Sequence, residues 1–408
     1  MPLRLEQSDS TTNPMRSLPS ACAALALGTT PALSAQTFQS PGMPGTVTGQ
    51  TDRFSNEFNP AIGGAFDVVG TWLDADQGEH GLDLSLRSFE LAANTWIDPN
   101  AWAYAVLVAS EEELGLEEAA VHYLGFGSRT TLRAGRFFVD FGKQMQAHVH
   151  DLPYTDRPGV LREYLGTELP GTGAQLDHWF PTGDDSALRF SCGVFDSLAG
   201  DEHDHGESGT DGGPEIVVPE RGTVHDLSFT ARLTQFMDAG EDGVFQWGVS
   251  GRFLPEFAFE DDDSGAVRDG LSNSVLGLDL TYGLGDETGL RAWTLGGEFL
   301  RYSGDIAATA VGPDLDVLDD AVDGYYVALD RKWSARDSAG LLYSAFEHPA
   351  RGAPSDSELT LYYTRNLTEF SRLRFGVTLA DRDEGSNSTL VTVQFTNLFG
   401  AHAHGINW

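Results

Sequence analysis

Alternation of apolar and polar side chains is the feature that most restricts how this chain can fold. From Asn59 onward, segments of about ten residues alternate in this way and are separated by turn residues. In one such segment Leu278 and Leu280 share a face. Asp279 and Thr281 share the opposite face, because side chains two residues apart on a strand point the same way. No run of about 18 apolar residues is present to form a membrane-spanning helix, so a chain that crosses a membrane with this pattern has to use strands.

The connections between the segments predict how the sheet is laid out. Strands are expected to start near Ile62, Leu84, Trp102, Glu118, Thr130, Gly173, Ala187, Asp226, Val244, Val275, Leu290, Gly324, Gly340, Glu358, Arg372 and Thr389. The links between them are expected to alternate strictly between long ones, such as residues 142–172 and 259–274, and short ones, such as residues 98–100 and 285–288. Outer-membrane barrels have long outer loops and short periplasmic turns. We therefore predict an all-β fold, a closed antiparallel transmembrane β-barrel of about sixteen strands.

The beginning of the chain has the features of an export signal. Met15-Arg16 provides a charged start, residues 21–27 are apolar, and Ala32-Leu33-Ser34-Ala35 is a small-residue cleavage site. Residues 36–58 are rich in Gly, Pro, Ser, Thr and Gln and show no periodicity. We expect a signal peptide over residues 1–35, a flexible periplasmic lead-in over residues 36–58 and the barrel over residues 59–408. The barrel is expected in the outer membrane of a Gram-negative bacterium.

The charge of the chain restricts its partners. The formal net charge is −36. It argues against nucleic acid as a partner, since binding nucleic acid requires a basic face. It favours cations as partners. The expected partners are outer-membrane lipid, small solutes or ions, and the outer-membrane assembly machinery, for whose substrates a terminal aromatic such as Trp408 is typical. No nucleophile elbow or zincin motif is present, so we predict that the chain is not an enzyme.

Three His-x-His pairs are candidate metal ligands: His148/His150, His203/His205 and His402/His404. In an extended segment both imidazoles of a pair point the same way and can face one cation such as Zn²⁺. The candidate ligands are His148, His150, Asp151, His203 and His205, and the first pair is expected at the outer mouth of the barrel. For the second pair the alternative is an acidic, solvated loop that happens to contain His. No cofactor is certain, and Zn²⁺ is the one candidate.

The long link over residues 142–172 is the richest in ionisable groups. In channels of about sixteen strands one long loop commonly folds inward, and charges at such a constriction set ion selectivity. The expected pore-lining residues are Lys143, Asp156, Arg157, Arg162 and Glu163. The alternative is a loop that packs on the rim of the barrel.

Several of these blocks resemble a poorly characterised bacterial family. They are Gly135-Arg136-Phe137-Phe138, Gln146-Ala147-His148-Val149-His150-Asp151, Asp156-Arg157-Pro158 and Ala174-Gln175-Leu176. Its members are described as zinc-regulated outer-membrane receptors or as porin-like proteins. The resemblance implies an outer-membrane barrel with a link to zinc supply. A receptor with 22 strands and a plug does not fit, because the chain lacks the length and residues 36–58 are too short for a plug.

These observations predict a porin-like channel for passive diffusion of small hydrophilic solutes or ions. Two alternatives remain open. One is an outer-membrane receptor that captures zinc or another divalent metal through His and acidic loops. The other is a structural anchor with a filled lumen.

Overall fold

The computed structural model describes residues 60–76, 80–111, 114–198, 215–217, 222–240, 242–261, 266–286, 290–307, 317–349, 353–383 and 385–400. The expected signal peptide and lead-in lie outside these residues, as do His203, His205, His402 and His404. Within the described part, no helix is long and apolar enough to cross a membrane.

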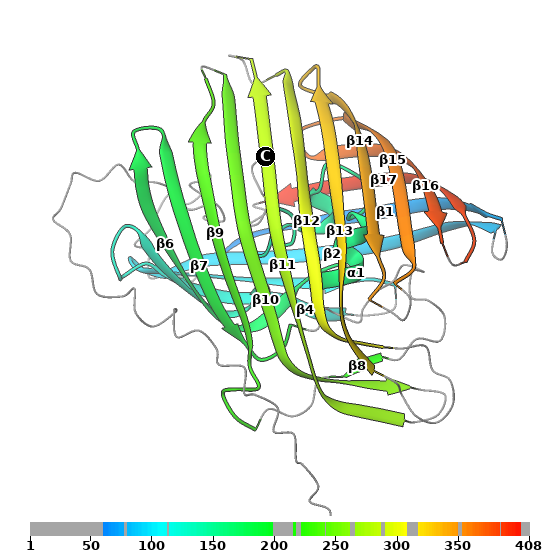
Figure 1. The fold of residues 1–408 in the computed structure, drawn as a ribbon. Helices are drawn as coiled ribbons and strands as arrows, with labels where there is room; N and C mark the ends of the chain where they lie inside the picture. The colour runs from blue at the N-terminus through cyan, green and yellow to red at the C-terminus, as the bar shows by residue number, and fades with distance from the viewer. Residues whose placement is uncertain are drawn as a thin grey trace, which may run out of the picture. The chain divides into compact units, whose positions relative to one another are not determined.

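One antiparallel sheet contains all the strands of the described residues (Figure 1). The strands are β1 (Ala61–Ala75), β2 (His80–Asp98), β3 (Ala101–Ala109), β4 (Leu114–Tyr123), β5 (Thr130–Phe138), β6 (Pro170–Gly183), β7 (Ser186–Phe195), β8 (Glu215–Val217), β9 (Ser228–Asp238), β10 (Gly243–Asp261), β11 (Ala266–Gly285), β12 (Ala292–Ala307), β13 (Val317–Lys332), β14 (Asp337–Glu347), β15 (Ser355–Asn366), β16 (Ser371–Arg382) and β17 (Ser388–Gly400). The sheet closes because β1 pairs with both β2 and β17. The short β8 pairs with β10 beyond the end of β9, so among the described residues sixteen strands form the closed wall. The predicted fold class is confirmed.

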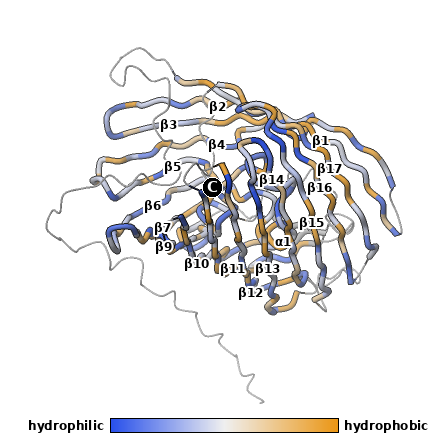
Figure 2. Tube along the Cα trace, turned by 90° about the horizontal axis from the view of Figure 1, so that it is seen from above, coloured by the Kyte–Doolittle hydropathy of each residue, from blue (hydrophilic) through white to orange (hydrophobic). Residues whose placement is uncertain are grey.

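The two faces of the wall differ as the alternation predicts. On β11, Leu278 and Leu280 are exposed on the outside, whereas Asp279 is buried on the inside. Figure 2 shows the same alternation of apolar and polar residues along the other strands. A row of exposed leucines is unfavourable in water and favourable in hydrocarbon, so the outer face is suited to lipid.

Strand ends on the outer side differ from the prediction. β11 starts at Ala266 rather than near Val275, and β10 continues to Asp261, which pairs with Ala266. The connection expected over residues 259–274 is therefore mostly a hairpin, and the strict alternation of long and short links was wrong. Residues 266–274 lack a row of large apolar side chains, because strand pairing beyond the lipid needs backbone hydrogen bonds but no apolar face.

The hydrophobic core of the protein lies inside the barrel. Residues 139–169, which we call the lumen segment, connect β5 to β6 and include the helix α1 (Gly159–Leu165), which lies within the ring of strands in Figure 2. Buried side chains of this segment, such as Met145 and Leu161, pack with inward residues of the wall, such as Val275 and Leu342. The segment therefore folds into the barrel, as one of the two sequence alternatives predicts, and does not pack on the rim.

The two faces of β11 provide a test of the wall. Leu280→Arg should destabilise the folded protein by roughly 2–4 kcal/mol, because it places a charge in lipid near the middle of the bilayer. Thr281→Arg, one residue away on the lumen side, should cost much less. Urea unfolding of both variants in lipid vesicles measures the difference. Equal costs at the two positions would contradict the assignment of the faces.

Candidate functional site

The lumen segment has little regular structure, so its backbone needs partners from elsewhere. It contains one turn of 3-10 helix, η2 (Val149–Asp151), and α1, which begins after Pro158 and ends at Leu165. The next residue, Gly166, has φ +85°. At Gly142, with φ +56°, a Cβ atom would overlap the carboxylate of Glu298, so glycine permits this close approach to β12. Carbonyl groups outside helices and strands are left without ladder partners and have to be satisfied by side chains or water.

Arginines supply these partners from one side of the wall. Arg374 of β16 donates to the carbonyl oxygen of Tyr154 at 2.6 Å and also to that of Leu152. Neighbouring Arg372 donates to the carbonyl of His150. The five N–H groups of a guanidinium suit this role, since one side chain can satisfy several carbonyl oxygens. Arginines of the wall therefore fix the path of the segment.

Arg157 plays the same role from within the segment. Its guanidinium donates to the carbonyl oxygens of Gln144 at 2.7 Å and Ala147 at 2.8 Å, and the side chain is buried. The prediction that Arg157 lines the pore was wrong, because a guanidinium that satisfies buried carbonyls is not available to water.

The opposite side of the segment is bound to β10 and β12. The backbone N–H of Lys143 donates to Glu298 Oε1 at 3.0 Å, and its Nζ donates to Gln246 Oε1 at 2.9 Å. Burial and, after it, the charge of Arg232 lower the pKa of Lys143 to about 8. At the start of the segment, Asp140 pairs with Arg189 Nη2 of β7 at 2.7 Å. The segment is thus held from both sides of the lumen.

The helix α1 presents charged residues near the outer end of the lumen. Arg162 bonds Glu358 of β15 at 2.7 Å and Asp156 at 2.8 Å. Glu163 pairs with His348 Nδ1 at 2.8 Å, and these side chains are partly exposed. Lys143, Asp156, Arg162 and Glu163 thus belong to the lumen segment, and their role in lining a pore remains a prediction.

The pair His148 and His150 lies in a buried cluster of glutamates and not at the outer mouth, so the predicted location was wrong. His150 Nδ1 is 2.9 Å from Glu90 Oε1 of β2. His148 Nδ1 is 3.1 Å from Glu117 Oε1, and its Nε2 is 3.1 Å from Glu118 Oε1. The lumen segment folds inward rather than outward because its apolar residues pack in the core inside the barrel.

A β-bulge brings both glutamates of β4 to this cluster. Val106 of β3 pairs with Glu118, but the next residue, Leu107, pairs with Leu116, so Glu117 is an extra residue in the ladder. A bulge redirects side chains, and here it allows two adjacent residues to reach His148. Glu117 and Glu118 interrupt the alternation of their segment in the sequence, and this was the available signal for a site residue that the sequence analysis missed.

Burial and charge act against each other on these histidines. Burial lowers the pKa of His148, but the charges of Glu117 and Glu90 outweigh it and hold the pKa well above its usual value. The pKa of His150 is also raised, because Glu90 and Asp151 outweigh burial. Asp151 Oδ1 lies 3.5 Å from His150 Nε2. Of the predicted metal ligands, the structure therefore brings His148, His150 and Asp151 together.

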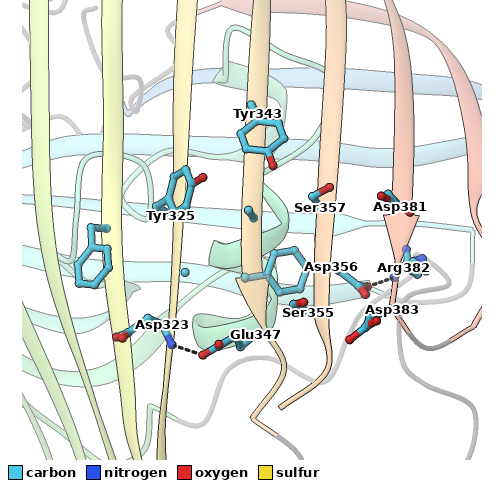
Figure 3. Close-up of a pocket in the computed structure, with 14 residues that line it drawn as sticks. Asp323, Tyr325, Tyr343, Glu347, Ser355, Asp356, Ser357, Asp381, Arg382 and Asp383 are labelled. Atoms are coloured by element: carbon cyan, nitrogen blue, oxygen red, sulfur yellow. Dashed lines mark hydrogen bonds and ion pairs between the residues drawn. The ribbon is translucent and has the colours of Figure 1, made fainter. Parts of the chain in front are cut away.

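A second candidate site, a hollow in the surface, lies on the outside of the wall. Figure 3 shows residues that line a hollow at the outer ends of β12–β16. Its volume is about 640 Å³. Tyr325 and Tyr343 line it and share the exposed outer face with Phe299. These three side chains point away from the lumen, so this part of the hollow faces outward.

Comparison with known proteins supports the fold. No protein-family model and no curated protein matches the chain. The loop L8 deletion mutant of OmpT, an outer membrane protein of Vibrio cholerae, matches at 10% identity and TM-score 0.54, covering 83% of this chain and 99% of that chain. The anion-selective porin from Comamonas acidovorans matches at 11% identity and TM-score 0.53 over 84% and 99% of the two chains. Pseudomonas putida OprB matches at 12% identity and TM-score 0.54 over 84% and 94%.

The fold is the outer-membrane porin barrel. Together with the apolar outer face, these similar structures confirm the predicted location in the bacterial outer membrane. The porin-like part of the sequence resemblance is supported, whereas nothing in the comparisons supports a zinc-regulated receptor.

The flat prediction that this chain is not an enzyme was wrong as stated. OmpT, which shares the fold, is 10% identical to this chain, and a fold shared at this identity decides neither for nor against catalysis. The comparison therefore leaves the enzyme status unresolved.

The arginine contacts can be tested at Arg374. Arg374→Met should destabilise the protein by about 2–4 kcal/mol, because it leaves the buried carbonyls of Leu152 and Tyr154 without donors. The lumen segment should also become sensitive to protease. Arg365→Met removes a guanidinium that pairs with Asp337 on the exposed surface, and should leave both properties unchanged. Equal protease resistance of the two variants would contradict this role of Arg374.

The contact between α1 and the wall should depend on pH. His348 lies between Glu163 at 2.8 Å and Asp356 at 3.0 Å. Burial lowers the pKa of His348, but its hydrogen bonds to the two carboxylates outweigh this and raise it from 6.5 to about 10. A raised folded-state pKa gives stability that is complete below pH 6.5 and is lost as pH rises toward about 10.

The free energy of unfolding of wild type and His348→Gln, measured by denaturant titration across this range, tests that dependence. The difference between the two proteins should shrink as pH rises, while groups common to both cancel. A difference that stays constant between pH 6.5 and 10 would contradict it.

Proposed function

We propose that this chain is an outer-membrane channel through which small hydrophilic solutes or ions diffuse passively. The observation that carries the proposal is the lumen segment, which crosses the inside of a sixteen-stranded barrel and presents partly exposed charges there. A barrel of this size encloses an aqueous space. Its porin and channel neighbours support a channel in general, and the solute class rests on the lumen itself.

The contacts of the segment favour small solutes. The segment bonds β2 through Arg87, β10 through Gln246, β12 through Glu298 and β15 through Glu358. A segment fixed to so many strands narrows the lumen, which supports small rather than large solutes for the proposed channel. The filled-lumen anchor differs from this proposal in one measurable respect, because it conducts no ions.

A receptor that captures zinc from the medium is not favoured. The side chains of His148 and His150 are 1% and 2% exposed, so they are not presented to the medium. Entry to them requires passage through the folded lumen.

Cysteine labelling in planar bilayers tests the channel. In a background with Cys22→Ser and Cys192→Ser, Thr281→Cys places a thiol on the lumen side of β11, and Leu280→Cys places one on the lipid side. We expect stepwise conductance from both proteins. A charged, membrane-impermeant thiol reagent should reduce it for Thr281→Cys and leave it unchanged for Leu280→Cys. Absence of conductance, or equal block of both variants, would contradict the proposal.

A further inference from the structure

The buried cluster of glutamates around His148 and His150 has the composition of a metal site. Glu90, His148 and His150 each offer one ligand atom, and these atoms lie within 4.8 Å of one another. Glu117, His148 and Glu168 form a second such group that shares His148. Two imidazoles with carboxylates form a donor set suited to Zn²⁺ and similar transition metals.

The distances between the donor atoms fit one ion. In tetrahedral zinc sites, bonds of about 2.0–2.2 Å place neighbouring ligand atoms about 3.4 Å apart. Glu90 Oε1 is 2.9 Å from His150 Nδ1 and 3.7 Å from His148 Nδ1. Glu117 Oε1 is 3.1 Å from His148 Nδ1. Donor atoms of Glu90, His148 and His150 all lie within 4.8 Å of one another and can therefore surround one ion. Glu117 belongs to the other group, so it lies beside this ion rather than among its ligands.

The far side of each imidazole is also arranged as in metal sites. His148 directs Nδ1 toward Glu90 and Glu117, and its other nitrogen, Nε2, lies 3.1 Å from Glu118 Oε1. His150 directs Nδ1 toward Glu90, and its Nε2 lies 3.5 Å from Asp151. A histidine that ligates a metal almost always donates its other ring N–H to a carboxylate or carbonyl, which fixes the ring.

The cluster holds more carboxylates than imidazoles. Glu90, Glu117, Glu118 and Glu168 outnumber the two imidazoles. Arg157 and Arg133 supply positive charge nearby, and their guanidinium groups donate to main-chain carbonyls. The side chain of Glu117 is only 9% exposed. Within the described part of the chain, its Oε2 atom is buried and accepts no hydrogen bond. Such an oxygen is unfavourable unless a cation or donor meets it.

We propose that Glu90, His148 and His150 bind one divalent transition-metal ion, for which Zn²⁺ is the best match, and that the ion links the lumen segment to β2. Two ligands come from the segment and one from the wall, so the ion acts as a cross-link. Its role is structural, and it goes beyond the proposed channel.

Zinc titration of the whole folded chain tests this site. The untagged protein carries His203→Ala, His205→Ala, His402→Ala and His404→Ala, so that the other His-x-His pairs cannot contribute. After treatment with chelator in detergent, calorimetry with Zn²⁺ should show one ion per chain. Co²⁺ should give the intense visible absorption of a tetrahedral site with nitrogen and oxygen ligands.

Variants in this background locate the ion. His148→Gln and His150→Gln should each weaken Zn²⁺ binding by at least about tenfold and abolish the Co²⁺ absorption. Glu118→Gln, which changes the partner of His148 Nε2 and none of the proposed ligands, should weaken binding by about 10–100-fold. His348→Gln is the matched control, because His348 also lies between two carboxylates but has no second imidazole beside it. It should leave Zn²⁺ affinity unchanged.

Heat-modifiable mobility in electrophoresis reports whether each variant is folded. Where a histidine variant does not fold, Glu90→Gln decides, since it keeps the size of the side chain and removes one ligand charge. Unchanged Zn²⁺ affinity in folded His148→Gln, or in Glu90→Gln, would overturn the proposal and leave the histidines as partners of the glutamates alone. Bilayer conductance is measured separately, so a chain that conducts without binding zinc would refute the metal site and not the channel.

Discussion

The pairing of β1 with β17 is the interaction on which the rest of this structure depends. It runs from Gly63 opposite Gly400 to Ala75 opposite Ser388, and it removes the last free edges of the sheet. In lipid an unpaired strand edge is very unfavourable, because no water is present to satisfy its N–H and C=O groups. Once the wall is closed, every strand has one face in lipid and one in the lumen. The alternation of apolar and polar residues in the sequence matches these two faces.

Closure also reverses the usual arrangement of a soluble protein. The leucines of β11 face outward, and the packed core is inside, where the lumen segment meets the wall. That core is surrounded by charged residues that a lipid face cannot accept. Arg374 and Arg157 are buried there because main-chain carbonyls of the segment accept their hydrogen bonds. The same arginines give an irregular segment a fixed course, which a channel needs if its narrowest part is to have a defined size.

The bulge in β4 links wall geometry to chemistry. With a regular ladder, Glu117 and Glu118 would point to opposite faces, and one of them would lie in lipid. The bulge brings both to His148, opposite Glu90 of β2. The cost of burying these carboxylates is offset where cations meet them, whether these are imidazolium groups or a bound metal ion. The cluster thus joins the segment to the wall at a β-bulge.

The sequence by itself determined the wall. Its period of two, read against the turn residues, predicted about sixteen strands and the two faces of regular segments such as the one around Leu278, because lipid and water act on every second side chain independently of the rest of the fold. It also indicated the lumen segment from its length and charge. It could not predict where β10 and β11 end, since strand pairing beyond the lipid leaves no apolar pattern.

Only the tertiary structure decided what the segment contacts. Glu90, Glu117, Glu118 and Glu168 are up to 78 residues apart in the chain, and they meet His148 only because β2, β4 and the segment converge inside the closed barrel. From its charge, Arg157 was predicted to line the pore. Its guanidinium instead donates to buried main-chain carbonyls, and the residues next to it in the sequence do not reveal these partners. Local patterns report the solvent on each side of a strand, whereas contacts across a lumen depend on the closure of the whole sheet.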